Sequence, residues 1–211
     1  NGDRDTAAPT LRSRLIKAAL DCFLADDYHN VTTRRMAECA GANVSMIRYY
    51  VGSKEGLYEE MIRETLNPLL EVLDGPLLAS TTGFEAFLGL YYRTMSERPE
   101  FPRLILKVLA LRHGPGRRFI QQLLERGRTR GARKVADLKA QGQVAAAIDP
   151  DILRMSFVSL AMTPMLLKDI FEEQMERPMD GDFLGQLAAF NGHLLAAGLA
   201  PAVSGSGGEQ A

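Results

Sequence analysis

The sequence predicts an all-α protein of about nine helices. Apolar residues recur with helical spacing along most of the chain, and no convincing segment alternates between apolar and polar residues as a strand does. Glycine, proline and capping residues divide the chain into pieces of helical length. With 211 residues, 46% of them hydrophobic and 24% charged, the composition is that of an ordinary soluble protein with one large or two small domains.

Three short helices are predicted near the N-terminus. They are expected over residues 10–25, 33–40 and 44–50. The first carries one apolar stripe along its length, and Thr32 or Thr33 is suited to cap the second. Gly41 begins a tight turn, after which Asn43 is suited to cap the third helix.

Proline, glycine and capping residues also separate the later helices. They are expected over residues 54–73, 82–98, 102–113, 117–140, 149–174 and 181–200. Ser53 is suited to cap the first of these, in which Pro68 predicts a kink or an early end. Asp149 followed by Pro150 is a strong helix start, and Pro164 predicts a second kink.

Two short helices joined by a glycine turn, within residues 32–58, are typical of a helix-turn-helix. In that motif the second helix enters the major groove of DNA. Between Thr32 and Lys54, four basic side chains stand against one acidic side chain, and they are Arg34, Arg35, Arg48 and Lys54 against Glu38. Such a local excess of positive charge suits contact with phosphates.

Several functional classes are not favoured. The formal net charge is −1, so DNA binding would depend on a local patch. The longest nearly uncharged run, residues 155–167, is too short to span a membrane, and the first ten residues do not resemble a signal peptide, so a cytoplasmic protein without a membrane partner is expected. His29, His113 and His193 are scattered, and no catalytic motif occurs at the required spacing. We therefore predict no metal, no cofactor and no catalytic residue; an all-helical enzyme is the disfavoured alternative.

Cys22 and Cys39 lie in segments with apolar periodicity. This placement favours two reduced and partly buried thiols. A redox-sensing pair is the alternative interpretation.

One string of residues between Leu11 and Ile62 has a recognisable spacing. Its members are Ile16, Ala18, Ala19, Phe23, Tyr28, Thr32, Thr33, Ala37, Ala40, Gly41, Tyr50, Ser53, Lys54, Glu55 and Leu57. They resemble the N-terminal signature of the tetracycline-repressor (TetR) family, with helix lengths and turn placement that agree. The resemblance implies a bacterial transcriptional regulator, by family default a repressor, that grips palindromic operator DNA as a homodimer and is released by a small-molecule effector.

Carried over by position, the resemblance implies two kinds of DNA contact. Base edges would be contacted from the start of the recognition helix by Asn43, Val44, Ser45 and Met46. The DNA backbone or a groove edge would be contacted by Thr33, Arg34, Arg48, Tyr49, Tyr50 and Lys54, although one of the two tyrosines is expected to be a packing residue. The family usually has Tyr in place of Arg48, Phe in place of Val51 and Gly in place of Asp27.

The last two predicted helices have the character of a dimer interface. Between residues 152 and 167 only Arg154 is charged, so this helix needs cover on nearly every side. Residues spaced by four on the last helix are small, which allows another helix to approach closely. The predicted interface comprises Met155, Ser159, Met162, Ala188, Gly192 and Ala196. A well-buried core within one chain is the alternative.

The resemblance also implies a pocket for an unknown effector. The side chains on the helices that enclose the cavity in the family are Tyr91, Met95, Leu106, Phe157, Met162 and Met165. Ordinary core packing is the alternative for these residues, and a constitutive or protein-controlled regulator without a small-molecule effector remains open. The predicted organisation is a disordered tail (1–9), a helix-turn-helix domain (10–53), a connecting helix (54–74), a ligand-binding and dimerisation domain (75–200) and a second disordered tail (201–211).

Overall fold

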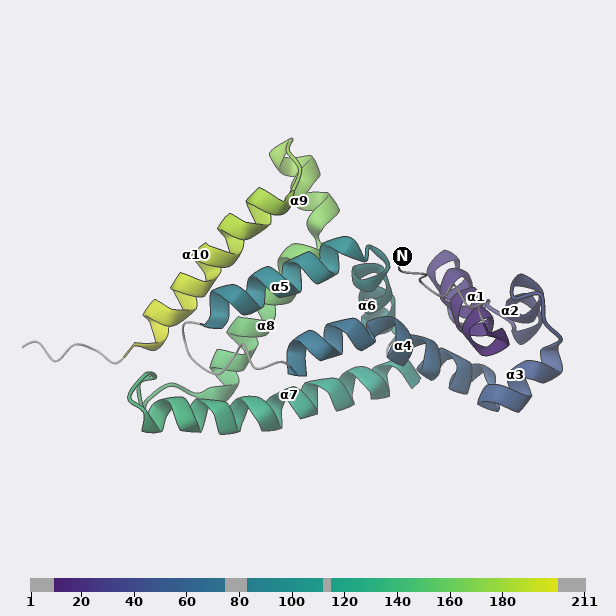
Figure 1. The fold of residues 1–211 in the computed structure, drawn as a ribbon, viewed down its shortest axis with the longest axis horizontal. Coiled ribbons are helices and arrows are strands. Elements are labelled where there is room, and N and C mark those ends of the chain that lie inside the picture. Colours follow the sequence, from purple (N-terminus) through teal and green to yellow (C-terminus); the bar gives the residue numbers. More distant parts are fainter. Residues whose placement is uncertain (1–9, 75–82, 112–114, 201–211) are drawn as a thin grey trace, which may run out of the picture. The chain divides into compact units, whose positions relative to one another are not determined.

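The computed structural model describes residues 10–74, 83–111 and 115–200, and within these ranges it contains helices and no strand (Figure 1). The helices are α1 (Leu11–Ala25), α2 (Thr33–Cys39), α3 (Val44–Val51), α4 (Lys54–Asp74), α5 (Gly83–Glu97), α6 (Glu100–Ala110), α7 (Pro115–Ala140), α8 (Pro150–Leu166), α9 (Lys168–Met175) and α10 (Gly181–Leu199). The prediction of an all-α fold is confirmed. None of the helices in the described ranges is both long and apolar enough to cross a membrane.

Side-chain caps set the starts of the early helices. Thr32 Oγ1 accepts the N–H of Arg35 at 3.2 Å, and Asn43 Oδ1 accepts the N–H of Ser45 at 2.9 Å. Ser53 Oγ in turn accepts the N–H of Gly56 at 3.0 Å, ahead of α4. Each cap satisfies an N–H that has no partner inside its own helix. The predicted caps Asn43 and Ser53 are confirmed, and Thr32 is the residue that caps α2.

The predicted helix over residues 149–174 is two helices, which accounts for a tenth helix in the described chain. Pro164 has no N–H to donate to the carbonyl oxygen of Leu160, and that oxygen accepts a hydrogen bond from Tyr92 Oη at 2.7 Å instead. One turn later Leu167 leaves the helical conformation, with φ −108° and ψ 18°, and α9 begins. By contrast, α4 continues through Pro68 to Asp74, so the early end considered there does not occur. The predicted cap Thr82 and the predicted helix end at His113 lie outside the described residues.

The chain forms two compact units. Unit 1 comprises Asn1–Asn67 and Glu100–Gln122, so it holds α1, α2, α3, most of α4, α6 and the start of α7. Within it, α1 packs against both α2 and α6, and α2 packs against α3. Its core includes an aromatic cluster in which the Phe23 and Tyr58 ring centroids are 4.6 Å apart and those of Tyr28 and Tyr58 are 4.9 Å apart.

Unit 2 comprises Pro68–Pro99 and Leu123–Ala211. Its centre is α5, which packs along α10 and also contacts α8. The approach of α5 to α10 is very close, because a Cβ atom added to Gly192 would lie 2.8 Å from the backbone nitrogen and Cα of Glu85. Asn191, a buried polar residue of this unit, donates from Nδ2 to Tyr92 Oη at 3.0 Å. One tyrosine hydroxyl therefore links α5, α8 and α10.

Candidate nucleic-acid interface

Helix α3 is positioned by the turn that separates it from α2. Gly41 has φ +61°, a left-handed conformation that glycine adopts without strain, and the N–H of Ala42 then donates to the carbonyl oxygen of Ala37. Asn43 restarts the helix by capping it, and its Oδ1 also accepts from Ser45 Oγ at 2.9 Å. These local bonds fix the angle at which α3 leaves α2.

One residue fastens α3 to the rest of unit 1. Ile47 is buried, whereas no other residue of α3 is. The exposed residues of this predicted DNA-contacting segment are Asn43, Val44, Ser45, Arg48, Tyr49 and Tyr50, and Met46 is half-buried. Tyr49 is 77% exposed and packs edge-on against Tyr50, with ring centroids 5.1 Å apart. The helix thus presents most of its side chains outward.

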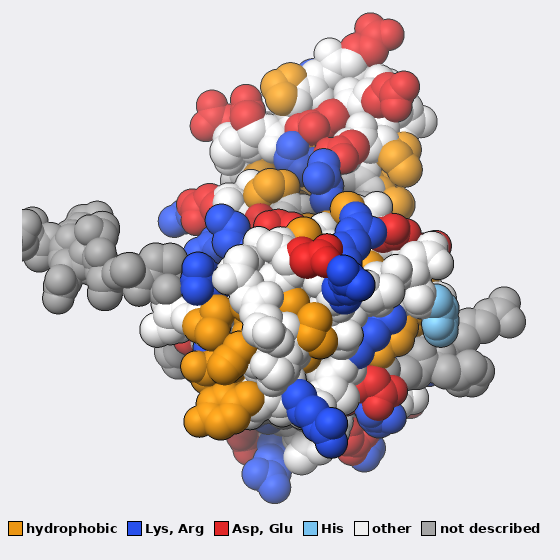
Figure 2. Space-filling view, turned by 90° about the vertical axis from the view of Figure 1, so that its right-hand side faces the viewer, with side chains coloured by type: hydrophobic (Ala, Val, Ile, Leu, Met, Phe, Trp, Pro, Cys, Tyr) orange, Lys and Arg blue, Asp and Glu red, His pale blue; other side chains and the backbone are white. Residues whose placement is uncertain are grey.

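The predicted basic residues differ in how they are engaged. Arg34 pairs with Glu38 at 3.0 Å, and because both side chains are largely exposed the pair is weak and easily exchanged for a phosphate. Arg35 pairs with Asp26 at 3.0 Å. Arg48 makes no ion pair or side-chain hydrogen bond with the described part of the chain. Figure 2 shows blue Lys and Arg side chains dispersed over the face that carries α2 and α3, with orange hydrophobic side chains gathered low on that face.

Lys54 is half-buried and turned toward its own chain. Its ammonium group donates to the carbonyl oxygen of Tyr28 and lies 4.3 Å from the centroid of the Tyr28 ring. Burial also lowers the pKa of Lys54. The ammonium group is therefore anchored on Tyr28, and it would have to share its remaining donors or swing out to contact a phosphate.

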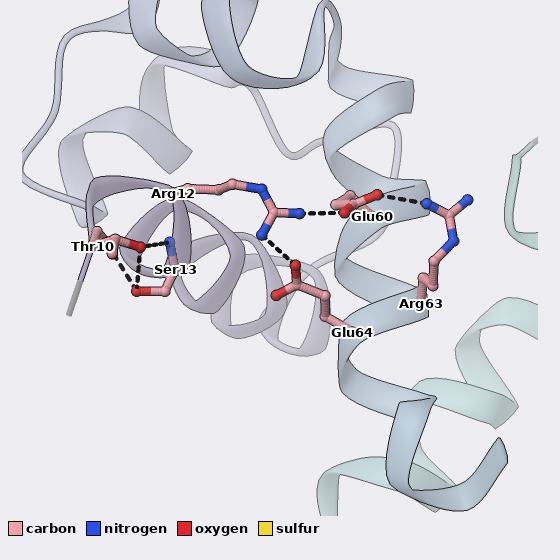
Figure 3. A network of polar contacts seen from close by, with 6 residues as sticks. All are labelled: Thr10, Arg12, Ser13, Glu60, Arg63 and Glu64. Carbon is pink, nitrogen blue, oxygen red and sulfur yellow. Dashed lines mark hydrogen bonds and ion pairs between the residues drawn. The ribbon is translucent and has the colours of Figure 1, made fainter. Parts of the chain in front are cut away.

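An ion-pair network that the sequence did not suggest joins α1 to α4 (Figure 3). Arg12 reaches from α1 to both Glu60 and Glu64 of α4, and Glu60 also pairs with Arg63 at 2.6 Å. Three members of this network border a polar cleft of about 280 Å³, which is lined by Arg12, Tyr50, Val51, Gly56, Glu59, Glu60 and Arg63. The network ties α1, the first helix of unit 1, to α4, the helix that follows α3. Only the i, i+3 and i, i+4 spacing of its α4 members was visible in the sequence.

The residues predicted to line an effector pocket are not all brought together. Tyr91, Met95 and Met165 are buried in unit 2, and Met162 is half-buried there. Phe157 of α8 packs with its ring centroid 5.0 Å from that of Phe87 on α5. Leu106 is 42% exposed on α6 and belongs to unit 1, so it does not share the core of the others.

The predicted dimer residues divide into two groups. Met155 and Ser159 are exposed on α8, as a contact with another molecule requires, and Met162 and Ala196 are half-buried. Ala188 and Gly192 are buried instead, because the small-residue face of α10 lies against α5 of the same chain. Their assignment to the dimer interface is corrected: the small residues serve a helix contact inside unit 2. The exposed apolar residues of α10 are Phe190 and Leu194.

Comparisons with known proteins agree with this architecture. Residues 15–61 match the bacterial regulatory proteins of the tetR family. The HTH-type transcriptional regulator RutR of Escherichia coli K12 is 28% identical over 109 residues, which are 49% of this chain and 50% of RutR, so the chain spans about half the length of the curated relatives it matches.

Solved structures share the fold over most of the chain. The transcriptional regulator SCO4942 from Streptomyces coelicolor superposes with a TM-score of 0.69 at 20% identity, covering 88% of this chain and 98% of that one. FadR from Bacillus subtilis, solved in complex with stearoyl-CoA, gives a TM-score of 0.68 at 16% identity with the same coverage. The N-terminal segment is therefore similar to the bacterial regulatory proteins of the tetR family, and the described helices share the fold of these solved structures.

Proposed function

We propose that the chain is a transcriptional regulator that binds double-stranded operator DNA as a homodimer and leaves it when a small molecule binds. The observation that carries the proposal is the placement of α3, which is anchored by Ile47 and presents most of its other side chains to solvent. A helix held in this way after a tight turn can enter a major groove without disturbing the core. Repression is the mode proposed, as the family default.

The proposed contacts are made from the first turn of α3 and from donors on the neighbouring residues. Asn43, Val44, Ser45 and Met46 would face base edges from the first turn of α3. The phosphate and groove-edge contacts would come from residues with hydrogen-bond donors, namely Thr33, Arg34, Arg48, Tyr49, Tyr50 and Lys54. Arg48 is the most direct candidate, because its guanidinium has no competing carboxylate among the described residues.

Dimerisation is proposed through α8 and α10. Ile152 and Met155 of α8 are 64% and 63% exposed, and Phe190 and Leu194 of α10 are 66% and 50% exposed. Large apolar side chains exposed on two helices are typical of an interaction surface. A second copy would cover them with the same residues around a two-fold axis.

The effector is proposed to be a small organic molecule bound in unit 2. The support is that FadR from Bacillus subtilis, which has the same fold, was solved with stearoyl-CoA bound. By linkage, a ligand that favours a conformation unsuited to DNA weakens DNA affinity by no more than its own preference between the two conformations. The candidate wall residues of unit 2 are Tyr91, Met95, Phe157, Met162 and Met165.

The DNA contact can be tested by fluorescence anisotropy with DNA that flanks the chain's own gene. We expect binding to an imperfect palindrome with an affinity that falls steeply as salt is raised. Arg48→Ala should weaken binding to all sequences by about tenfold at physiological salt and reduce the slope of the salt dependence by about one. Arg133→Ala, which removes another exposed arginine, in unit 2, is the matched control.

Specificity is tested separately. Exchanges at Ser45 and Met46 should alter the preference among operator variants, because these positions face base edges in the proposal. The assignment of Arg48 fails if its alanine variant binds as tightly as the unaltered protein while Arg133→Ala does the same. A thermal-shift screen that includes acyl-CoA esters would identify an effector, since a ligand of the native state raises the melting temperature.

A further inference from the structure

Two sulfur atoms meet between α1 and α2. Cys22 Sγ and Cys39 Sγ are 3.8 Å apart, and the chain contains no other cysteine. Sulfur atoms at this separation are in contact, so no other side chain stands between them. A disulfide requires an S–S distance of about 2.05 Å, so the two atoms need to approach by less than roughly 2 Å.

The surroundings of the two thiols allow this approach. Cys22 lies in the last turns of α1, where it is held in the core of unit 1. Cys39 is the last residue of α2, and the chain turns at Gly41 two residues later. Because Cys22 lies on the buried face of α1, the approach would have to come from the last turn of α2, where Cys39 is exposed.

The two cysteines also differ in the way that a stepwise oxidation requires. Burial, and after it the adjacent Cys39 thiol, raise the pKa of Cys22 to about 11, so Cys22 stays protonated near neutral pH. Cys39 is exposed, and its sulfur is the one that a dissolved oxidant can reach. One accessible thiol backed by one sheltered thiol in contact with it is the arrangement of an attacked and a resolving cysteine.

We propose that Cys39 and Cys22 form an oxidation site at which a hydroperoxide produces a reversible disulfide between α1 and α2. The Cys39 thiolate attacks the hydroperoxide, the O–O bond breaks, and the released alkoxide or hydroxide takes up a proton, which leaves Cys39 as a sulfenic acid. Cys22 then attacks Cys39 Sγ, the S–O bond breaks, and the leaving hydroxide takes the proton of Cys22 as water. Both thiols are oxidised, and the peroxide is reduced to an alcohol or water and a second water.

The site would act on DNA binding, and this part rests on the proposed function. Cys39 ends the first helix of the helix-turn-helix, four residues ahead of the cap Asn43. Drawing that end toward α1 displaces the turn on which α3 depends. Hydrogen bonds to DNA tolerate little displacement, so the disulfide form is expected to bind operator DNA at least about tenfold more weakly.

The test treats the full chain, at low micromolar concentration, with hydrogen peroxide, then unfolds it in denaturant and adds a thiol-alkylating reagent, so that the buried Cys22 can also react. Intact-mass spectrometry should show the loss of two hydrogens and no alkylation, and peptide mapping should place the bridge between Cys22 and Cys39. Dithiothreitol should restore both thiols and the operator affinity. Cys39→Ser should keep a single alkylatable thiol, and Cys22→Ala should stop at a sulfenic acid that dimedone traps on Cys39.

The outcomes separate this proposal from the proposed function. Two alkylatable thiols after peroxide treatment, or a bridge only between chains, would overturn the oxidation site whatever the DNA result. A bridge that forms without changing operator affinity would overturn its role in DNA binding. Failure of the reduced protein to bind any DNA would count against the proposed function and leave the mass measurement valid. Thermal denaturation of Cys22→Ala shows whether this buried position still folds.

Discussion

Tyr92 shows how one buried hydroxyl can serve three helices. Its Oη donates to the carbonyl oxygen of Leu160 on α8 and accepts from Asn191 on α10. The acceptor on α8 exists because Pro164 cannot supply the usual N–H one turn later. The proline thus leaves a carbonyl oxygen of α8 without its usual helical donor, and the tyrosine hydroxyl from α5 donates to that oxygen.

Tyr92→Phe should therefore destabilise the protein by about 1–3 kcal/mol, because it leaves a buried carbonyl and a buried amide without their partner. Chemical denaturation would measure the change. Tyr91→Phe is the control, since this neighbouring tyrosine is equally buried and its hydroxyl makes no hydrogen bond to the described residues. Equal losses in both variants would mean that Tyr92 acts through packing alone.

Residue roles were predictable from the sequence where the partner is local. The caps Asn43 and Ser53 bond to backbone groups two or three residues ahead, so position in the chain identifies them. The partners of Lys54 and Arg12 lie 26 and 48 residues away. Nothing in local spacing indicates that Lys54 packs on Tyr28 rather than projecting freely, which is why its engagement was not foreseen.

Among the elements, α10 has small residues that another helix approaches closely, as predicted, but the predicted identity of that helix was wrong. Its small residues do admit another helix at close range, as their spacing indicates. That helix is α5 of the same chain, and sequence periodicity cannot tell an internal neighbour from a second molecule. Similarly, the Pro164 signal was correct in place, but the pattern could not show that the helix would end at Leu167 instead of bending.

Gly192→Ala should lower stability by about 1–3 kcal/mol, although alanine favours helices, because its methyl group would meet the backbone of Glu85 at 2.8 Å. Gly185→Ala on the same helix meets nothing within 4 Å and should raise stability by up to about 1 kcal/mol. Thermal melts of the two variants make the comparison. A stabilised Gly192→Ala would show that α5 and α10 are further apart than described.

The segment after α9 is held to that helix by a hydrogen bond to Glu172. Its Oε1 accepts from Lys168 Nζ at 2.5 Å and from the N–H of Met179 at 2.6 Å, and these two bonds lower the pKa of Glu172. A carboxylate with a lowered folded-state pKa stabilises the fold above its unfolded pKa of about 4.3, and this contribution is lost as pH falls through the folded value.

Glu172→Gln should therefore cost about 1 kcal/mol at pH 7 and progressively less below about pH 4. Glu173→Gln, at the exposed neighbouring position, should change stability little at either pH. Urea unfolding at several pH values would follow the difference. A cost for Glu172→Gln that did not change with pH would exclude the carboxylate charge as its source.

For the whole molecule, the exposed apolar side chains of α8 and α10 predict that two copies of the chain associate as a dimer. Phe190→Glu and Met155→Glu should each convert a dimer to monomers, because they place a charge in the proposed apolar contact. Sedimentation velocity over a range of concentrations measures this. Leu124→Glu changes an exposed leucine of α7 and should leave the dimer intact. A wild-type protein that sediments as a monomer at every concentration would remove the dimer from the proposed function.

Unit 1 is assembled from two separate stretches of sequence, and this matters for anyone who wishes to transplant it. The apolar face of α6, with Phe101, Leu104, Ile105 and Val108 buried, belongs with α1, and Lys107 donates to the carbonyl oxygen of Asp26. An excised piece ending at Asn67 would leave that side of α1 bare and aggregation-prone. A hybrid regulator that borrows this head must therefore also carry residues 100–122, spliced in at a second place in the recipient gene.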